Sequence, residues 1–125
     1  MTEKILIVDD EKDLRETLAE MLRESGYEVS EAIDGEKGLQ MSLEVKPDLI
    51  LLDIMMPIMD GHEMLRQLRR DDWGKDAKVL MLTAASDPAH VTEAVVHGGD
   101  DYIIKSTTPL DELLKKVKQA LAGYE

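Results

Sequence analysis

Short runs of apolar residues alternate along the chain with longer stretches in which apolar residues recur every three or four positions. The short runs have the length of β-strands, and the longer stretches have the period of amphipathic helices. Repetition of this pair is typical of an α/β domain built around a parallel sheet. Five strands are predicted in this way, and they cover Lys4–Asp9, Glu28–Ala32, Leu49–Asp53, Val79–Thr83 and Tyr102–Lys105.

The patterns of the runs also indicate where each strand lies in the sheet. Ile5–Val8, Leu49–Leu52 and Val79–Leu82 are continuously apolar, which is expected of central parallel strands that helices cover on both faces. The run Tyr27–Ala32 alternates between polar and apolar residues, so we expect it to form an edge strand.

Residues that cap or terminate helices delimit the stretches between the strands. Asp34, Asp60 and Asp87 are candidate N-caps of the second, third and fourth helices. Glu63 lies three residues after Asp60, which is the spacing of a capping box. Gly26 is placed to end the first helix in a left-handed conformation. The last helix carries an apolar stripe that we assign to the core, formed by Leu110, Leu113, Leu114, Val117 and Leu121.

Length, composition and charge narrow the class of protein. The chain has 125 residues, of which 43% are hydrophobic and 34% charged, and this predicts one globular domain over residues 1–125. The 27 acidic and 15 basic residues give a net charge of -12, which argues against direct binding to nucleic acid. The apolar runs are too short to span a membrane. The absence of cysteine fits a reducing cytoplasm, where we expect the protein to act.

Polar side chains follow or end the predicted strands. Asp9 and Asp10 follow the first strand, Asp53 ends the third, Thr83 the fourth and Lys105 the fifth. Parallel strands bring these ends to one edge of the sheet, where three close carboxylates repel one another unless a cation joins them or some of them protonate. Mg²⁺ prefers such oxygen ligands. The hydroxyl and the ammonium group suit an anion, and the usual anion beside Mg²⁺ is a phosphoryl group.

The chain resembles the receiver domain of two-component response regulators, the family that includes the single-domain chemotaxis regulators. Four segments carry the resemblance in family order and spacing, namely Val8–Glu11, Leu51–Gly61, Leu82–Ala85 and Asp101–Lys105. The resemblance implies a flavodoxin-like (βα)5 three-layer sandwich, in which a parallel five-stranded sheet has the order 2-1-3-4-5. The length of 125 residues matches one such receiver domain, so we expect no attached output domain.

The resemblance implies a role for each acid of the cluster. Asp53 would be the phosphoacceptor, which attacks the phosphoryl group of a phosphohistidine on a histidine kinase or a histidine phosphotransfer protein. Asp10, Asp53 and the main-chain carbonyl of Met55 would hold Mg²⁺ directly, and Asp9 would act on the ion largely through water. The chain would then be no enzyme, but a phosphoacceptor that assists its own phosphorylation and dephosphorylation.

The resemblance also implies how the signal leaves the domain. The Thr83 hydroxyl and the Lys105 ammonium would bind oxygens of the transferred group. If Thr83 moves toward that group, Tyr102 can turn inward to fill the space, so both are expected to be switch residues. A downstream effector protein would read the face formed by the fourth helix, the fifth strand and the fifth helix. We expect a monomer or a weak, phosphorylation-dependent dimer.

Two other functions use the same residues. A magnesium-dependent phosphatase with an aspartyl-phosphate intermediate commonly carries a second acid two residues after the nucleophile, where this chain has Met55. An interaction module that works without phosphorylation needs neither the acidic cluster nor Lys105. Met55 therefore argues against the phosphatase, and the acidic cluster with Lys105 argues against the interaction module.

Two departures from the usual family pattern lead to predictions. Ser106 stands where most members have proline after the lysine, so we predict a trans peptide bond and an altered loop there. Met55 and Ala85 flank the reaction centre without a side-chain group that orients water. We therefore predict slow self-dephosphorylation.

Overall fold

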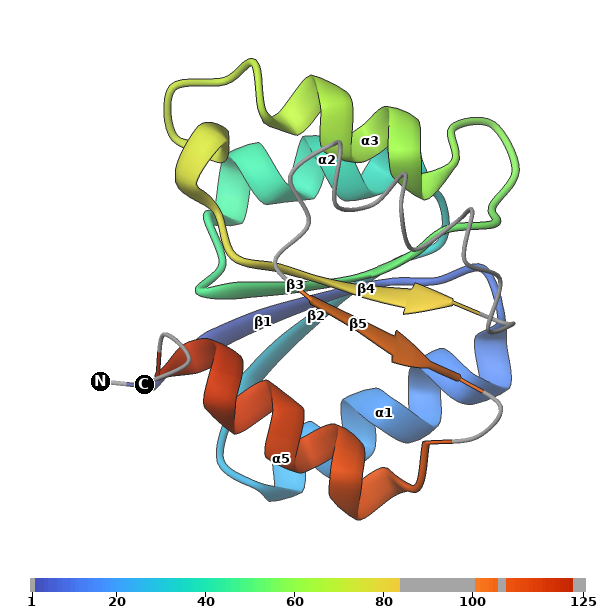
Figure 1. Ribbon diagram of the computed structural model, residues 1–125, viewed down its shortest axis with the longest axis vertical. Helices are drawn as coiled ribbons and strands as arrows, with labels where there is room; N and C mark the ends of the chain where they lie inside the picture. Colours follow the sequence, from blue (N-terminus) through green and yellow to red (C-terminus); the bar gives the residue numbers. More distant parts are fainter. Residues whose placement is uncertain (1, 84–100, 106–107, 123–125) are drawn as a thin grey trace.

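The computed structural model describes residues 2–83, 101–105 and 108–122 (Figure 1). Within these residues the strands are β1 (Lys4–Val8), β2 (Glu28–Ala32), β3 (Leu49–Asp53), β4 (Val79–Thr83) and β5 (Asp101–Ile104). The helices are α1 (Lys12–Glu24), α2 (Gly35–Val45), α3 (Gly61–Leu68) and α5 (Leu110–Leu121), with a 3-10 turn at Gly74–Asp76. The predicted fourth helix, with its cap Asp87, lies outside the described residues. None of the described helices is long and apolar enough to cross a membrane.

The strands form one parallel sheet in the order β2-β1-β3-β4-β5. This confirms the flavodoxin-like fold and the edge position of β2. Helices α1 and α5 cover one face of the sheet, and α2 and α3 cover the other (Figure 1). Val8 is paired with both Ala32 and Leu52, and Thr83 is paired with Ile104. The carboxyl ends of the strands are therefore nearly level along one edge.

The continuous apolar runs fill two cores, because successive side chains of a strand point to opposite faces. Ile5 and Ile7 pack on the side of α1 and α5. Leu6 and Val8 pack on the side of α2 and α3. The two cores contain no phenylalanine, as the sequence requires, and consist of leucine, isoleucine, valine, alanine and methionine side chains with half-buried aromatic residues at their margins.

The predicted helix caps are present in α2 and α3. A carboxylate oxygen of Asp34 accepts from the Lys37 amide at 2.8 Å, and one of Asp60 accepts from the Glu63 amide at 2.9 Å. The capping box is incomplete, because the Glu63 carboxylate pairs with Arg66 one turn further along the helix. Each cap satisfies an amide that the first turn leaves without a helical partner, which fixes where the helix begins.

Two other expectations have different outcomes. Gly26 has a φ of +97°, so it ends α1 in the left-handed region, as predicted. The apolar stripe of α5 is buried at Leu113 and Val117, whereas Leu110, the first residue of the helix, is largely exposed. Leu110 therefore lies at the end of the stripe and outside the core.

Candidate functional site

Three carboxylates meet at the carboxyl edge of the sheet. Because β1 and β3 are neighbours, the residues at and just beyond their ends lie side by side. Asp9, Asp10 and Asp53 each offer an oxygen, and these oxygens lie within 4.8 Å of one another. Asp9 and Asp53 are buried, and Asp10 is exposed. The structure thus brings together the acids that the sequence placed at this edge, in an arrangement that fits a hard divalent cation.

Lys105 reaches the same cluster from the far side of β4. Its ammonium nitrogen lies 2.9 Å from Asp9 Oδ2 and 3.5 Å from Asp53 Oδ2. Its main-chain amide donates to the Thr83 carbonyl at 2.7 Å, which fixes the residue just beyond the end of β5. A third carboxylate, that of Glu11, accepts from the same ammonium group at 2.8 Å. The positive charge of Lys105 therefore lies between the buried carboxylates of Asp9 and Asp53 and the exposed carboxylate of Glu11.

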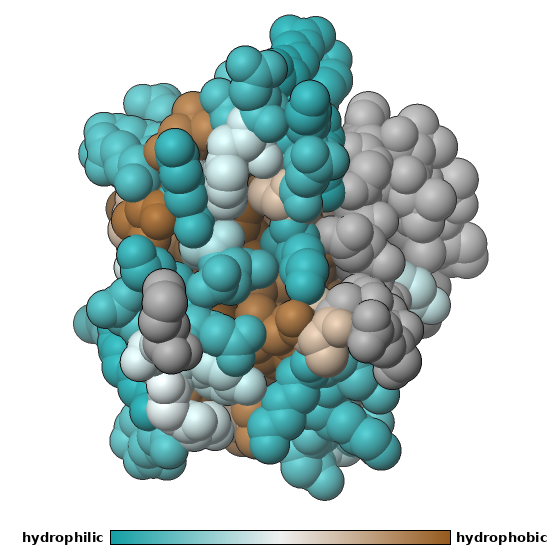
Figure 2. Space-filling view, turned by 90° about the vertical axis from the view of Figure 1, so that its left-hand side faces the viewer, coloured by the Kyte–Doolittle hydropathy of each residue, from teal (hydrophilic) through white to brown (hydrophobic). Residues whose placement is uncertain are grey.

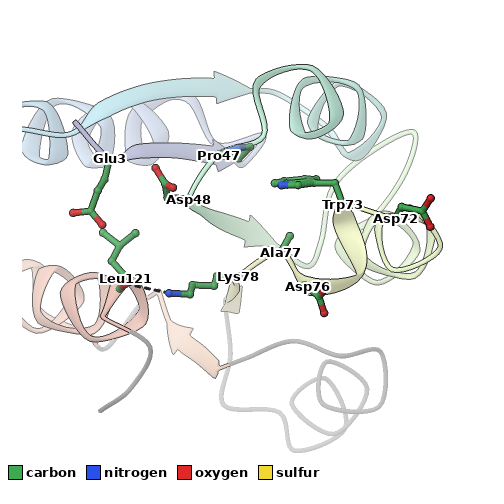
Figure 3. A pocket seen from close by; sticks show the side chains of 9 residues that line it. All are labelled: Glu3, Pro47, Asp48, Asp72, Trp73, Asp76, Ala77, Lys78 and Leu121. Carbon is green, nitrogen blue, oxygen red and sulfur yellow. Dashed lines mark hydrogen bonds between the residues drawn. The ribbon is translucent and has the colours of Figure 1, made fainter. Parts of the chain in front are cut away.

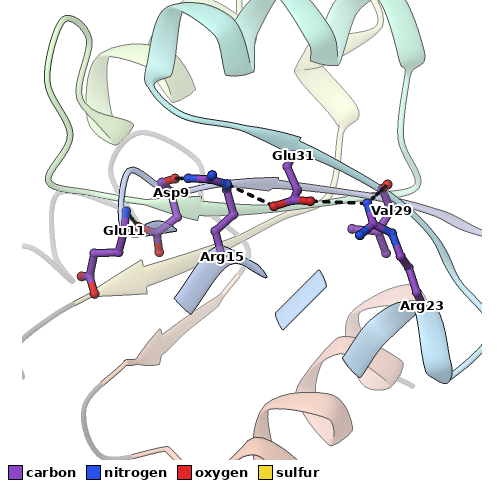
Figure 4. Close-up of polar contacts among 6 residues, drawn as sticks. All are labelled: Asp9, Glu11, Arg15, Arg23, Val29 and Glu31. Atoms are coloured by element: carbon purple, nitrogen blue, oxygen red, sulfur yellow. Dashed lines mark hydrogen bonds and ion pairs between the residues drawn. The ribbon is translucent and has the colours of Figure 1, made fainter. Parts of the chain in front are cut away.

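The Asp9 carboxylate is held in one orientation by its neighbours. Oδ1 accepts from the Glu11 amide at 2.9 Å (Figure 4), and Oδ2 pairs with Lys105. The main chain of Asp9 is also fixed, since its amide donates to the Ala32 carbonyl at 3.1 Å and its carbonyl accepts from Arg15 Nη1 at 2.9 Å. Asp9 Oδ1 is thus fixed by a hydrogen bond, whereas the buried Oδ2 has an ion pair with Lys105 and no hydrogen bond among the described residues.

Burial and charge shift the acid-base behaviour of the cluster. Burial, followed by the neighbouring Asp9 and Asp10 carboxylates, raises the pKa of Asp53 to about 7 although the Lys105 charge lowers it. Burial alone lowers the pKa of Lys105, but its contacts with the Glu11 and Asp9 carboxylates and the charge of Asp53 raise it well above its ordinary value. Lys105 is therefore charged at every physiological pH. Asp53 exchanges its proton near neutrality unless a cation stabilises its anion.

Thr83 and Tyr102 lie at different depths. Thr83 ends β4, the strand next to β3, one residue beyond the partner of Asp53, and it is buried. Tyr102, on β5, is 37% exposed. Its ring lies under the Lys116 ammonium at 5.6 Å, and the same ammonium donates to the Tyr102 carbonyl at 3.1 Å. The ring therefore takes an outward position against α5, which leaves the predicted inward turn as an untested expectation.

The loop after β3 folds tightly against the strand that it leaves. The Gly61 amide donates to the Ile54 carbonyl at 2.8 Å, and a Cβ on Gly61 would lie 2.2 Å from the Asp53 carbonyl oxygen. Only glycine permits this close approach. Met55, two residues after Asp53, is 62% exposed. The loop thus places Met55 at the surface beside the acidic cluster.

A cleft at the opposite edge of the sheet is separate from this cluster. Its volume is about 410 Å³, and Figure 2 shows the face on which it opens, with apolar surface surrounded by hydrophilic side chains. Lys78, which lines it, donates to the Leu121 carbonyl at 3.0 Å (Figure 3). The acids Glu3, Asp48 and Asp76 face the same space. This charge is unsuited to a phosphoryl group.

Two residues around the cluster, Glu11 and Arg15, were not identified from the sequence as part of it. Glu11 belongs to a recognised segment, but its pairing with Lys105 joins residues far apart in the chain. Arg15 on α1 joins the Asp9 carbonyl to the Glu31 carboxylate on β2. Polar residues in the first turn of a helix are ordinarily solvated. The sequence therefore indicated a contact of Arg15 with the cluster only through its position one turn after Glu11.

The chain matches the family model described as the response regulator receiver domain over residues 5–118. It is 37% identical over 118 residues to the DNA-binding dual master transcriptional regulator RpaA of Synechocystis. It is 41% identical over 117 residues to the phosphate regulon transcriptional regulatory protein PhoB of Pseudomonas aeruginosa. Each match covers 94% of this chain, but 48% of RpaA and 51% of PhoB. The chain therefore spans about half the length of these curated relatives.

Solved structures agree with this match along the chain. The chemotaxis protein CheY4 of Vibrio cholerae superposes with a TM-score of 0.90 at 30% identity, over 96% of this chain and 99% of that chain. The response regulator TrrA of Thermotoga maritima, solved in complex with Mg²⁺-BeF, has a TM-score of 0.83 at 39% identity. That match covers 95% of this chain and 99% of TrrA.

Proposed function

Since this chain belongs to the response regulator receiver domain family, we propose that it accepts a phosphoryl group on Asp53. Receiver domains are signalling domains of two-component systems. The observation that carries the proposal is the position of Asp53, a buried carboxylate beside Asp9 and Asp10 with the Lys105 ammonium 3.5 Å away. This arrangement supplies a nucleophile, a cation and a candidate metal site within one cluster.

The proposed reaction transfers the phosphoryl group of a phosphohistidine on a histidine kinase or histidine phosphotransfer protein. A carboxylate oxygen of Asp53 forms the new bond to phosphorus, while the bond to the donor imidazole nitrogen breaks and its electron pair stays on the imidazole. Lys105 and the Thr83 hydroxyl bind oxygens of the transferred group. Their positions at the ends of β5 and β4 allow both to act from the same edge of the sheet.

The residues present fit a magnesium ion. We assign direct coordination to Asp10, Asp53 and the main-chain carbonyl of Met55. We assign Asp9 a role through water, because Oδ1 accepts from the Glu11 amide and Oδ2 forms an ion pair with the Lys105 ammonium. Bound Mg²⁺ would neutralise charge on the phosphoryl oxygens. A cation here also favours the ionised form of Asp53, which is the form that attacks.

The proposed output is a change in protein binding on the surface formed by β5 and α5. Tyr102 lies on this surface, and its ring and its carbonyl both contact Lys116 of α5. Inward rotation of Tyr102 would break the contact of the ring with Lys116 and so alter what a downstream effector protein meets. We propose that the protein acts in the cytoplasm. We also propose that it is a monomer or forms a weak dimer that depends on phosphorylation.

Acetyl phosphate and Mg²⁺ provide the test of this proposal. Intact mass spectrometry is expected to find one added phosphoryl group in the wild-type chain and none in Asp53→Asn. Continuous release of phosphate over many turnovers would instead favour the phosphatase, for which Met55 replaces the usual second acid. A chain that stays unmodified but still binds its partner would favour a module that works without phosphorylation.

A further inference from the structure

We propose that Arg15 is a positioning residue, which sets the geometry of the metal site by holding the main chain at Asp9. The inference rests on the proposed function, because it concerns how well the acidic cluster binds Mg²⁺. Arg15 does not contact the carboxylate groups of the candidate metal ligands. It acts through the peptide bond that joins Asp9 to Asp10, whose carbonyl belongs to Asp9.

The side chain of Arg15 joins three elements of the fold. It leaves the first turn of α1, and its Nη1 donates to the Asp9 carbonyl at 2.9 Å. Its Nε donates to Glu31 Oε1 at 3.1 Å, on the neighbouring strand β2 (Figure 4). The Arg15 side chain is only 11% exposed. These contacts tie the turn after β1 to both a helix and an adjacent strand.

The held peptide controls the direction of two acids. The carbonyl that accepts from Arg15 lies between the Cα atoms of Asp9 and Asp10, so its orientation sets the backbone from which the Asp10 side chain leaves. Asp10 is exposed and belongs to the oxygen cluster, and its direction depends on this turn. The planar guanidinium group suits this task, because its fixed fork holds the carbonyl and the Glu31 carboxylate at the same time.

Arg23 provides an internal comparison on the same helix. Its Nη2 contacts the other oxygen of Glu31, Oε2, at 3.4 Å and donates to the Val29 carbonyl at 3.0 Å (Figure 4). The Arg23 side chain is 51% exposed. Arg15 and Arg23 thus share helix, charge and carboxylate partner, and they differ in whether the guanidinium group holds the turn that carries Asp9 and Asp10.

Electrostatics and positioning predict opposite effects when Arg15 is replaced. A guanidinium group near the cluster repels a divalent cation, so its removal alone strengthens Mg²⁺ binding. Loss of the hold on the Asp9 carbonyl loosens the ligand set and weakens Mg²⁺ binding. The sign of the change in affinity therefore separates the two effects.

The experiment titrates Mg²⁺ into wild type, Arg15→Gln and Arg23→Gln and follows backbone amide resonances by NMR. We expect Arg15→Gln to weaken Mg²⁺ binding on the order of tenfold. Arg23→Gln removes the same charge and should bind Mg²⁺ as tightly as wild type or slightly more tightly. The Glu11 amide, which donates to Asp9 Oδ1, should shift upfield in Arg15→Gln without metal and stay in place in Arg23→Gln.

Unfolding by urea without Mg²⁺ shows whether each variant is folded. If Arg15→Gln does not fold, Arg15→Lys replaces it, because one ammonium group cannot hold the carbonyl and Glu31 in the same geometry. Equal or tighter Mg²⁺ binding by the folded Arg15 variant, with an unshifted Glu11 amide, would overturn the positioning role and leave the proposed function intact. Failure of the wild-type chain to bind Mg²⁺ would overturn both.

Discussion

The ammonium group of Lys105 lies 3.5 Å from the carboxylate of Asp53, although β4 lies between β3, which ends at Asp53, and β5, which Lys105 follows. The sheet order thus joins residues that are far apart in the sequence. This ion pair holds a cation where negative charge would increase during phosphoryl transfer. It also lowers the pKa of Asp53 against the larger effect of burial.

Replacement of Lys105 by glutamine tests this relationship. The variant loses a cation that contacts Asp9 and Asp53, so the pKa of Asp53 should rise further. Without that charge on the phosphoryl oxygens, we expect the rate of phosphorylation by acetyl phosphate at neutral pH to fall on the order of a hundredfold. Intact mass against time measures the rate. Lys116→Gln, which changes a lysine on α5 away from the acids, should keep the wild-type rate, and an equal loss there would contradict a specific role for Lys105.

The raised pKa of Asp53 predicts that stability without metal depends on pH. The folded chain binds a proton at Asp53 up to pH about 7, whereas the unfolded chain releases it near the ordinary pKa of 3.8. Stability should therefore fall as pH rises between these values and level off above the upper one. We expect Asp53→Asn to be more stable than wild type at pH 8, by on the order of 2–4 kcal/mol, and similar at the acidic end.

Urea unfolding of both proteins across this pH range, in the presence of a chelator, measures the difference. Added Mg²⁺ should stabilise wild type at pH 8 and reduce the gap, because the ion binds the folded chain. A gap that stays the same at every pH would show that Asp53 ionises at its ordinary value.

Asp10 is the acid whose replacement should affect metal binding with least effect on folding. It is exposed, and it contributes an oxygen to the cluster. Asp10→Asn should weaken Mg²⁺ binding on the order of tenfold and leave the urea midpoint without metal nearly unchanged. Asp13→Asn removes the same charge from an exposed residue in the first turn of α1. If both variants lose affinity equally, general acidity rather than coordination attracts the ion.

The close packing of Gly61 against the end of β3 predicts a large effect of one methyl group. A Cβ at Gly61 would lie 2.2 Å from the Asp53 carbonyl oxygen, so the loop or the strand must move. Gly61→Ala should destabilise the fold by on the order of 2–3 kcal/mol and slow phosphorylation. Gly26→Ala meets open space and only the strain of a φ of +97°, so it should cost about 1 kcal/mol and leave phosphorylation unchanged.

The sequence predicts the sheet and the acidic cluster because both depend on patterns within short segments. Continuous apolar runs identify β1, β3 and β4, and the residues that follow them must meet at one edge. The contacts of Arg15 and Glu11 depend instead on side-chain directions across elements, which no local period records. Leu110 shows the same limit, because its helical spacing fits the core stripe although its side chain is largely exposed.

Met55 predicts a long-lived phosphorylated state. It lies two residues after Asp53, it is 62% exposed, and a thioether cannot orient an attacking water as an amide can. After phosphorylation and removal of acetyl phosphate, Met55→Asn should lose its phosphoryl group faster than wild type, on the order of tenfold, which intact mass spectrometry follows. Ile58→Asn is the matched control, because Ile58 is exposed in the same loop and its φ of 68° is one that asparagine tolerates.

Ala85, the other predicted flanking residue, lies outside the described residues. Faster decay in Met55→Asn alone would assign the slow reaction to the missing water-orienting group, whereas equal decay in all three proteins would mean that Met55 does not limit it.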